Sequence, residues 1–351
     1  MLQSKQAEES FVPLFCGLPD DLSLLCLAKV PRRYHHVLRC VSKRWRAFLS
    51  SEEWHFCRGK YSLEEAWIYA MCRDKCGHNC LYVLDPERHS WKHIDTIPSA
   101  CLKRLGMSFE ASGKKLYLLG GGDGWDKDCA DDVFCYDPSA ERWKEAARMP
   151  TDRCFFLSAA VDNKIFVTAG TGSGSPTKLK EWDIYDPISN SWRSESNPMP
   201  ISDRLKSTCF NGKIYTFHKT WYNKIYARVY DPLSKKWEDI HKEIASCQFG
   251  PMVIVDGTLY MLDETSGTRL MIWDQEYQLW VPLARLSLQL TRPPCQLAAI
   301  GRKIFIIGTG LSTVVVDVDM AVNARGILVT SSFAPRDVDN VDIVGCKAIA
   351  I

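Results

Sequence analysis

The chain has 351 residues, with 44 Lys and Arg against 42 Asp and Glu, so its formal net charge is only +2. A balance this even argues against a protein that binds nucleic acid or a membrane surface over its whole length. The length fits two domains, or one large all-β domain with a small partner.

The 15 cysteines are scattered from Cys16 to Cys346, and the first ten residues of the chain are polar. This pattern predicts reduced thiols in a cytoplasmic or nuclear protein, not a disulfide-linked secreted domain. No stretch approaches the roughly 18 consecutive apolar residues that a membrane helix needs. We therefore expect no membrane partner.

Residues 14–58 are predicted to form a small helical domain, after a flexible N-terminus over residues 1–13. Pro19, Asp20 and Asp21 favour a helix start, because Pro suits the first turn and the acids complement the helix dipole. An apolar stripe at helical spacing follows and ends at Pro31. Its members are Leu18, Leu22, Leu25, Cys26 and Val30. Two more short helices, over residues 34–41 and 43–49, carry Leu38, Val41, Trp45, Phe48 and Leu49 on one apolar side. A linker over residues 59–65 is expected next.

This segment resembles the F-box, a three-helix module. The resemblance rests on the run Leu18 to Leu22, on Cys26-Leu27, on Val30-Pro31, on Val41 with Trp45, and on Trp54. The segment departs from the family at Ser42, where Cys is usual. The resemblance implies docking to a Skp-type adaptor through Leu18, Pro19, Leu22, Leu27, Val30 and Pro31. The alternative is a helical cap that resembles the F-box by chance.

Basic residues are dense within the same segment. They are Lys29, Arg32, Arg33, Arg39, Lys43, Arg44 and Arg46. A run of this kind could bind nucleic acid, but on a helical bundle it favours a solvated face or the side that meets an acidic adaptor. We therefore expect no nucleic-acid partner.

Four soft metal ligands lie close together just after the helical segment: Cys72, Cys76, His78 and Cys80. Zinc accepts these residue types, but structural sites usually pair two ligand clusters that are separated by a loop or a helix. Three of the four are too tightly spaced to coordinate easily from an extended strand. The segment is therefore a weak zinc candidate, and no metal is expected.

A repeat dominates the rest of the chain, because an Asp is followed six residues later by a Trp in five places. The pairs are Asp85 and Trp91, Asp137 and Trp143, Asp186 and Trp192, Asp231 and Trp237, and Asp274 and Trp280. The tryptophans lie 43 to 52 residues apart. A constant inner offset with a variable outer spacing predicts one rigid hairpin that is repeated with loops of different length.

Each unit contains four short runs with strand character. In the second unit these include residues 114–122, 133–138 and 141–146, rich in Tyr, Val, Leu and Phe. The Trp on the far arm of the hairpin can fill the wedge between neighbouring sheets. A four-stranded sheet cannot bury both faces alone, so the sheets must pack side by side, and radial packing gives a β-propeller.

The count of units is six. Residues 295–333 form the sixth, with Asp317 in register and Asn323 where Trp would fall. The first unit lacks its innermost strand, and residues 344–351 resemble such strands. We therefore predict a mainly β fold, with a six-bladed propeller over residues 66–351 that its C-terminal strand closes.

The repeat resembles the kelch family, whose blades carry paired glycines, a Tyr-Asp pair and a Trp. Gly120-Gly121, Tyr136-Asp137 and Trp143 match fully. Other units are degenerate, since Ala169-Gly170 keeps one glycine and the corresponding pairs at 217–218 and 262–263 keep none. The alternative is another propeller family with a similar period.

A helical module of this kind followed by kelch blades resembles the plant F-box/kelch-repeat proteins, most closely the SKP-interacting-partner group. The resemblance implies a substrate receptor of an SCF-type ubiquitin ligase. The adaptor would connect it to the cullin and the RING protein, and the propeller would bind an unidentified protein substrate. Such a receptor needs no cofactor and no catalytic residue. The alternatives are a non-degradative interaction scaffold and, less favoured, a propeller enzyme.

Candidate substrate-binding residues come from the loops between strands. Arg104, Arg153, Arg204 and Arg292 recur where an innermost strand begins, and could converge on an acidic or phosphorylated peptide. Alternatively, each could pair with an acid of a neighbouring blade. Trp125, Trp221 and Tyr222 lie in loops between second and third strands, and exposed aromatics beside Arg are typical of binding hot spots. No hydrolase, metalloprotease or phosphate-loop motif occurs, so catalysis is not expected.

Overall fold

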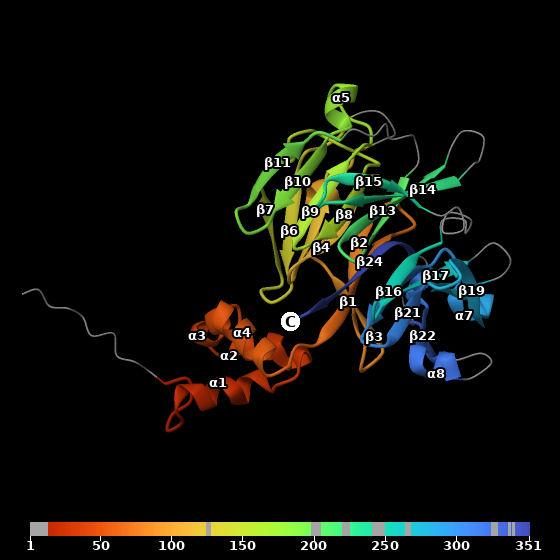
Figure 1. Cartoon of the computed structure of the whole chain (residues 1–351). Coiled ribbons are helices and arrows are strands. Elements are labelled where there is room, and N and C mark those ends of the chain that lie inside the picture. Colours follow the sequence, from red (N-terminus) through yellow and green to blue (C-terminus); the bar gives the residue numbers. More distant parts are fainter. Residues whose placement is uncertain are drawn as a thin grey trace, which may run out of the picture. The chain divides into compact units, whose positions relative to one another are not determined.

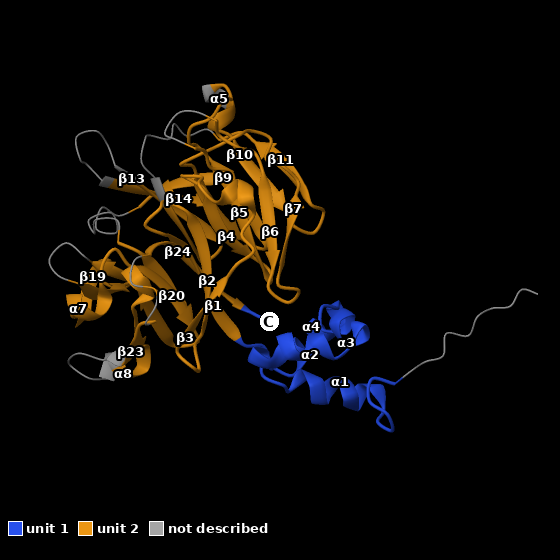
Figure 2. Ribbon diagram, turned by 180° about the vertical axis from the view of Figure 1, so that it is seen from behind, with its two compact units in different colours: residues 1–65, 350–351 blue, residues 66–349 orange. Residues whose placement is uncertain are grey.

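A computed structural model describes residues 13–123, 128–197, 205–219, 225–240, 250–263, 268–323, 329–335, 338 and 341–351. The chain divides into two compact units (Figure 2). The helical unit contains residues 1–65 and 350–351, and the β unit contains residues 66–349. Among the described residues, no helix is both long enough and apolar enough to cross a membrane.

The helical unit contains four α-helices and a short 3-10 turn among its described residues. They are α1 (Asp20–Ala28), η1 (Arg32–Tyr34), α2 (His35–Val41), α3 (Lys43–Phe48) and α4 (Glu52–Lys60). The sequence predicts the first three helices but not α4, which extends into the expected linker. The start signal of α4 is nevertheless present, because the Ser51 hydroxyl accepts a hydrogen bond from the Trp54 amide and two acids occupy the first turn.

The β unit consists of six four-stranded antiparallel sheets, which we number as blades one to six. Blade one contains β24 (Asp342–Ala350), β1 (Ala66–Arg73), β2 (Asn79–Asp85) and β3 (Ser90–Ile94). Blade two contains β4 (Ser108–Ser112), β5 (Lys115–Leu119), β6 (Val133–Asp137) and β7 (Arg142–Ala146). Blade three contains β8 (Leu157–Val161), β9 (Lys164–Thr168), β10 (Trp182–Asp186) and β11 (Ser191–Glu195).

The other three blades follow the same order. Blade four contains β12 (Leu205–Phe210), β13 (Lys213–Lys219), β14 (Ile225–Asp231) and β15 (Lys236–Asp239). Blade five contains β16 (Met252–Val255), β17 (Thr258–Asp263), β18 (Arg269–Asp274) and β19 (Leu279–Arg285). Blade six contains β20 (Gln296–Ile300), β21 (Lys303–Ile307), β22 (Thr313–Asp317) and β23 (Val329–Phe333). The predicted six-bladed propeller is confirmed.

Short helical segments lie in the connections of the β unit. They are η2 (Ser99–Cys101), α5 (Pro176–Leu179), α7 (Leu288–Thr291), η3 (Thr309–Leu311) and α8 (Val318–Asn323). The last of them begins directly after β22, so Asn323 lies in a helix at the place where the other blades carry their Trp.

The C-terminal strand closes the ring, as the sequence predicts. In the sheet of blade one, β24 pairs with β1, although the two strands lie at opposite ends of the β unit in sequence (Figure 1). The C-terminal end of the chain therefore supplies the strand that pairs with β1 and completes the sheet of blade one.

The Asp of each repeat ends a third strand and organises the turn that follows. In all six blades its Oδ1 accepts a hydrogen bond of 2.9 to 3.0 Å from the backbone amide two residues later. These amides belong to Glu87, Ser139, Ile188, Leu233, Glu276 and Asp319. In blades one to five the short carboxylate thus fixes a tight hairpin turn by a local bond, whereas in blade six the same bond precedes α8.

The Trp of each repeat packs between its own blade and the preceding one. Trp192 of blade three lies against the apolar residues of blade two and donates a 2.8 Å hydrogen bond to the Ala147 carbonyl. Trp91 of blade one likewise donates to Thr313 of blade six, at 3.1 Å. The predicted wedge role of these side chains is confirmed, and it explains why the offset from Asp to Trp is constant.

Candidate functional site

The helical unit presents apolar side chains along α1 and α2 that its own core does not cover. The core contains Leu27, Ala28, Leu49, Trp54 and Cys57. Leu22 on α1 is 47% exposed and Pro19 at its start is also exposed, whereas Leu18 is half-buried. Val30 and Pro31, which follow the helix, are half-buried as well. An exposed Leu and Pro on a short helix form an apolar contact surface.

One of the predicted adaptor-binding residues is in the wrong place for that role. Leu27 is only 2% exposed, because it lies on the side of α1 that packs in the core with Trp54. The expectation that Leu27 contacts a partner is therefore corrected, and its role is to hold α1 in the unit. Leu27 is not part of the apolar stripe: it comes five residues after Leu22, so it lies about 140° around the helix from it, on a different side.

Sequence reasoning also missed exposed apolar residues. Val41, which was expected on the core side, is 58% exposed, and Val37 and Tyr34 on the same helical stretch are exposed as well. On α4, Phe56 is 71% exposed. Val37 and Val41 lie four residues apart, so they share one face of α2. The apolar surface of the helical unit is therefore larger than the α1 residues alone.

Ser42, the residue at which the segment departs from the resembled family, has a structural role of its own. It is the N-cap of α3, where its hydroxyl accepts a 3.0 Å hydrogen bond from the Trp45 amide. This bond satisfies one of the amides that a helix start leaves free. The departure therefore preserves the helix junction.

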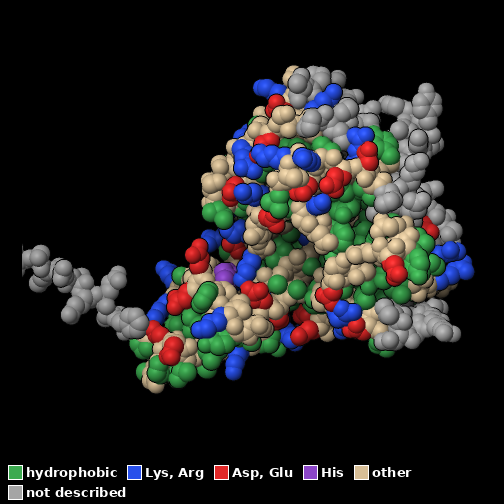
Figure 3. Space-filling view, viewed as in Figure 1, with side chains coloured by type: hydrophobic (Ala, Val, Ile, Leu, Met, Phe, Trp, Pro, Cys, Tyr) green, Lys and Arg blue, Asp and Glu red, His purple; other side chains and the backbone are tan. Residues whose placement is uncertain are grey.

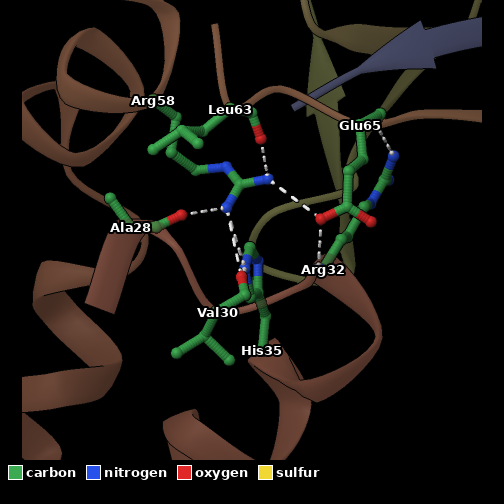
Figure 4. Close-up of polar contacts among 7 residues, drawn as sticks. All are labelled: Ala28, Val30, Arg32, His35, Arg58, Leu63 and Glu65. Carbon is green, nitrogen blue, oxygen red and sulfur yellow. Dashed lines mark hydrogen bonds and ion pairs between the residues drawn. The ribbon is translucent and has the colours of Figure 1, made fainter. Parts of the chain in front are cut away.

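A buried arginine, Arg58, connects the end of α1 to the segment after α4 by hydrogen bonds to backbone carbonyls (Figure 4). The Arg58 guanidinium, which is 1% exposed, donates through Nη1 to the carbonyls of Ala28 at 2.6 Å and Val30 at 3.2 Å. Through Nη2 it donates to the Leu63 carbonyl and lies 3.3 Å from the Glu65 carboxylate. A cation at these carbonyls also complements the negative end of the helix dipole.

The basic run of residues 29–46 is not a uniform solvated face. Arg32 is buried, its amide donates to Glu65 Oε1 at 2.7 Å, and its Nη1 donates to the Glu65 carbonyl at 3.1 Å (Figure 4). The Glu65 carboxylate therefore accepts a hydrogen bond from the Arg32 amide and also forms an ion pair with Arg58. Lys29, Lys43, Arg44 and Arg46 are exposed, although Arg44 lies 4.0 Å from Asp20 and Arg46 Nε donates to the Arg39 carbonyl at 3.2 Å.

His35 lies inside this network as a neutral ring. Its Nε2 is 3.1 Å from the Val30 carbonyl and 3.5 Å from Arg58 Nη1. Burial lowers the pKa of His35 from 6.5 to about 3, and the charges of Arg58, Arg32 and Arg39 act in the same direction. The hydrogen bond to the Val30 carbonyl opposes this shift. Protonation of His35 therefore opposes folding.

Acidification from pH 7 to pH 5 is expected to lower the free energy of unfolding of the helical unit by about 2 kcal/mol. In the unfolded chain His35 takes up a proton below pH 6.5, whereas in the folded unit it does so only near pH 3. The loss therefore begins below pH 6.5 and continues to about pH 3. Hydrogen exchange of peptides from residues 13–65, corrected for intrinsic rates, measures it. His35→Gln should lose most of this pH dependence, and an unchanged dependence in that variant would disprove the assignment.

Three of the four predicted arginines of the β unit lie among the described residues, and their surroundings differ. Arg104 is largely buried and pairs with Asp132 of its own blade at 2.6 Å, while its carbonyl accepts bonds from Arg73 and Asn79 of blade one. Its Nη1 is buried without a hydrogen-bond partner in the described part of the chain. Arg292, at the end of α7, is exposed.

Arg153 is the clearest correction in the β unit. Its side chain is 0% exposed, and its Nη2 lies 2.7 Å from the carboxylate of Asp183 on β10. Nη1 donates to the carbonyls of Ala169 at 2.8 Å and Leu179 at 2.7 Å. A side chain with no exposed surface cannot reach a substrate, so Arg153 is structural. The acid that it binds belongs to its own blade, not to a neighbouring one as the alternative expected.

The remaining predicted substrate-binding residues lie outside the described residues. They are Arg204, Trp125, Trp221 and Tyr222. On the face of the β unit shown in Figure 3, acidic and basic side chains are interspersed. The described part of this face therefore presents no extended surface of one charge sign.

The fold does not bring together the four soft ligands of residues 72–80, which span the end of β1 and the start of β2. Cys72 is buried on β1 directly opposite Cys80 on β2, whereas Cys76 is exposed in the turn between the strands. His78 lies 3.7 Å from Asp74. Within the described ranges, no three His, Cys, Asp or Glu side chains come close enough to hold a metal ion. The weak zinc hypothesis is therefore not supported by the geometry.

Comparisons with known proteins match both units. A family model described as an F-box domain matches residues 15–56, and one described as the FKB95 Kelch-repeats domain matches residues 96–308. The F-box/kelch-repeat protein SKIP4 of Arabidopsis thaliana is 38% identical, over 99% of this chain and 97% of that protein. SKIP30 of the same plant, also an F-box/kelch-repeat protein, is 26% identical over 86% of this chain and 84% of that protein.

Among solved structures, that of YjhT has a similar fold. It matches with a TM-score of 0.51 and 13% sequence identity, and the match covers 72% of this chain and 96% of that one. At this identity the likeness concerns the fold alone.

Proposed function

The chain belongs to the F-box/kelch-repeat proteins, and from this membership we propose that it is the substrate-recognition subunit of an SCF-type ubiquitin ligase. The observation that carries the proposal is the pairing, in one chain, of a helical unit matched by the F-box model with a propeller matched by the kelch model. The first would bind a Skp-type adaptor and the second a protein substrate.

Adaptor binding is assigned to the apolar surface of the helical unit. Leu18, Pro19 and Leu22 at the start of α1 contribute to it, together with Val30 and Pro31. Leu27 is buried, so it holds α1 in the helical unit and does not itself contact the adaptor. The adaptor would in turn connect the protein to the cullin and the RING protein. Exposed lysines and arginines near this apolar surface would speed the association of an acidic partner more than they would raise its affinity.

The receptor itself contributes no bond-breaking chemistry in this proposal. It holds a substrate near a ubiquitin-loaded conjugating enzyme, so it raises the effective concentration of the reacting groups. The propeller loops would select the substrate, and the identity of that substrate is not encoded in the fold.

Replacing Leu18 and Pro19 together by Ala is expected to weaken adaptor binding at least about 30-fold, the loss typical of removing a hot spot. Isothermal titration of the full chain with purified Skp-type adaptor measures the effect. Ile188→Ala, which truncates an exposed apolar side chain of the β unit, serves as the matched control for general loss of apolar surface. Unchanged affinity in the double variant, with an intact helical circular dichroism signal, would refute the assignment.

A degradative role makes a separate prediction. Proteins captured by the propeller should accumulate when the proteasome is inhibited, and should not do so when residues 1–58 are removed. Proximity labelling of both forms, with and without inhibitor, measures this. Partners whose abundance is insensitive to the inhibitor would favour a non-degradative scaffold.

A further inference from the structure

Two thiols meet at the junction between blades two and three. The Sγ atoms of Cys129 and Cys154 are 2.7 Å apart. Cys129 lies in the connection from β5 to β6 in blade two, and Cys154 lies in the crossover from β7 to β8 that enters blade three. Both cysteines are reduced in the structure. The sulfur atoms need to approach by only about 0.7 Å to reach the length of a disulfide bond, about 2.05 Å.

The backbone holds both residues in place on either side of this contact. Cys129 forms an isolated bridge with Gly122, and Cys154 forms one with Thr171, where two backbone hydrogen bonds of 2.8 and 2.9 Å join the pair. Next to the cysteines, the Arg153 amide donates to the Ala130 carbonyl at 3.1 Å. The two connections are therefore bonded to each other independently of the thiols, so a disulfide requires little movement of the backbone.

The side chains around the pair also fix the sulfur atoms. Cys154 Sγ lies 3.0 Å from the Thr171 hydroxyl, and Cys129 Sγ donates to the Thr171 carbonyl at 3.3 Å. Thr171 therefore contacts both sulfurs, which keeps them facing each other. Cys72 and Cys80 are also directly opposite each other, on β1 and β2, but they do not share this arrangement, because Cys72 Sγ is directed at the Ala70 carbonyl.

We propose that Cys129 and Cys154 are a redox modification site, at which sustained oxidation forms a reversible disulfide that links blades two and three. With hydrogen peroxide as the oxidant, the Cys129 thiolate attacks one peroxide oxygen and releases hydroxide, which leaves a sulfenic acid. The Cys154 sulfur then attacks the Cys129 sulfur, the S–S bond forms and water leaves. In sum, two thiols and one peroxide give one disulfide and two waters.

The order of these steps follows from the exposure of the two residues. Cys129 is half-buried and can meet a small oxidant, whereas Cys154 is fully buried and acts as the resolving thiol. Burial, together with the contact to Cys154, raises the pKa of Cys129 to about 12. Because only the thiolate reacts, oxidation should be slow at neutral pH and about tenfold faster for each unit of pH. The site would therefore respond to sustained oxidation, not to a brief pulse.

The consequence of the disulfide is a covalent connection between two loop segments of neighbouring blades. Residues 129 and 154 are 25 positions apart, so the bond would close a loop of moderate length and stabilise the β unit. It would also limit the separation of the β5–β6 connection from the crossover. This inference does not depend on the ligase proposal, because it concerns the oxidation chemistry of the β unit itself.

The test uses the purified full chain. It is treated with hydrogen peroxide, its free thiols are blocked, and its disulfide-linked peptides are identified by mass spectrometry. We expect one dominant linked pair, Cys129 with Cys154, reversed by dithiothreitol, and a melting temperature higher by about 5 °C than in the reduced protein. Cys129→Ser, which changes the more exposed partner, should show neither the link nor the shift.

Two controls keep the proposal falsifiable. Cys80→Ser removes one member of the other facing pair and should leave both the link and the melting shift intact. Cys154→Ser tests the resolving role, since it should trap Cys129 as a sulfenic acid that dimedone labels. Oxidation that leaves Cys129 and Cys154 unlinked, or that links Cys72 with Cys80 to the same extent, would overturn the proposal.

Discussion

Deletion of residues 344–351 is expected to abolish cooperative folding of the propeller. These residues form most of β24, the strand that completes blade one beside β1. Without them, β1 becomes an exposed edge with unpaired amides and carbonyls. The loss of buried Ile349 alone removes about 1.5–3 kcal/mol, a substantial part of the about 5–15 kcal/mol that stabilises a typical domain.

A polar network on β24 adds to this loss. Lys347 Nζ lies 2.8 Å from the buried carboxylate of Glu110 on β4, and the Ser158 hydroxyl on β8 donates to the same carboxylate at 2.7 Å. Deletion therefore leaves Glu110 with an uncompensated charge in a buried site, which is costly. Because the network joins strands of blades one, two and three, the damage should spread beyond blade one.

Thermal unfolding followed by near-ultraviolet circular dichroism measures the effect. The shortened chain should show no cooperative transition, or one at least about 10 °C lower. Val344→Asn is the matched control, because this residue of β24 is 48% exposed and its substitution leaves the strand in place. A shortened protein that melts like the full chain would show that β24 does not hold the ring together.

The parts of this fold that sequence alone predicts are those that local chemistry determines. The Asp of each hairpin accepts a hydrogen bond from the amide two residues later, and its Trp follows at a fixed offset. Both residues can therefore be recognised within a short stretch of sequence. Ring closure was also predictable, because residues 344–351 repeat the pattern of an innermost strand that the first blade lacks. Even α4, which was missed, had a local signal in Ser51 and the acids that follow it.

The candidate site was harder to predict because burial is decided by residues far apart in the chain. Leu27 and Leu22 both belong to α1, but only the fold shows that the side with Leu27 packs in the core with Leu49 and Trp54. Arg153 has the sequence context of Arg104 and Arg292, yet its carboxylate partner lies 30 residues away. No pattern of nearby residues contains that information. The contact between Cys129 and Cys154 is hidden in the same way.

Replacing Asp183 by Ala is expected to destabilise the β unit by about 3–5 kcal/mol. Asp183 is 1% exposed and holds the buried guanidinium of Arg153 at 2.7 Å. Its other oxygen accepts a hydrogen bond of 2.5 Å from the Ser194 hydroxyl. Removing the carboxylate leaves a buried positive charge without a counterion, and that penalty is larger than the net value of the ion pair itself.

The reverse change should be just as costly, for a different reason. Arg153→Met leaves Asp183 uncompensated and also removes the donor for the carbonyls of Ala169, Leu179 and Lys178. Replacing both residues with apolar ones would relieve the charge but not these carbonyls. The double variant should therefore recover only part of the stability, and the coupling energy of the cycle should be at least about 1 kcal/mol.

Urea unfolding of the single and double variants measures these energies, with Arg148→Ala as the matched control. Arg148 also pairs with acids, Asp131 at 3.1 Å and Asp132 at 3.0 Å, but it is 65% exposed, so its loss should cost at most about 1 kcal/mol. If Arg153 served a substrate instead, Asp183→Ala would leave the stability of the free protein within about 0.5 kcal/mol of the parent. A large loss in the absence of any ligand therefore separates the structural role of Arg153 from the binding role that its sequence context indicates.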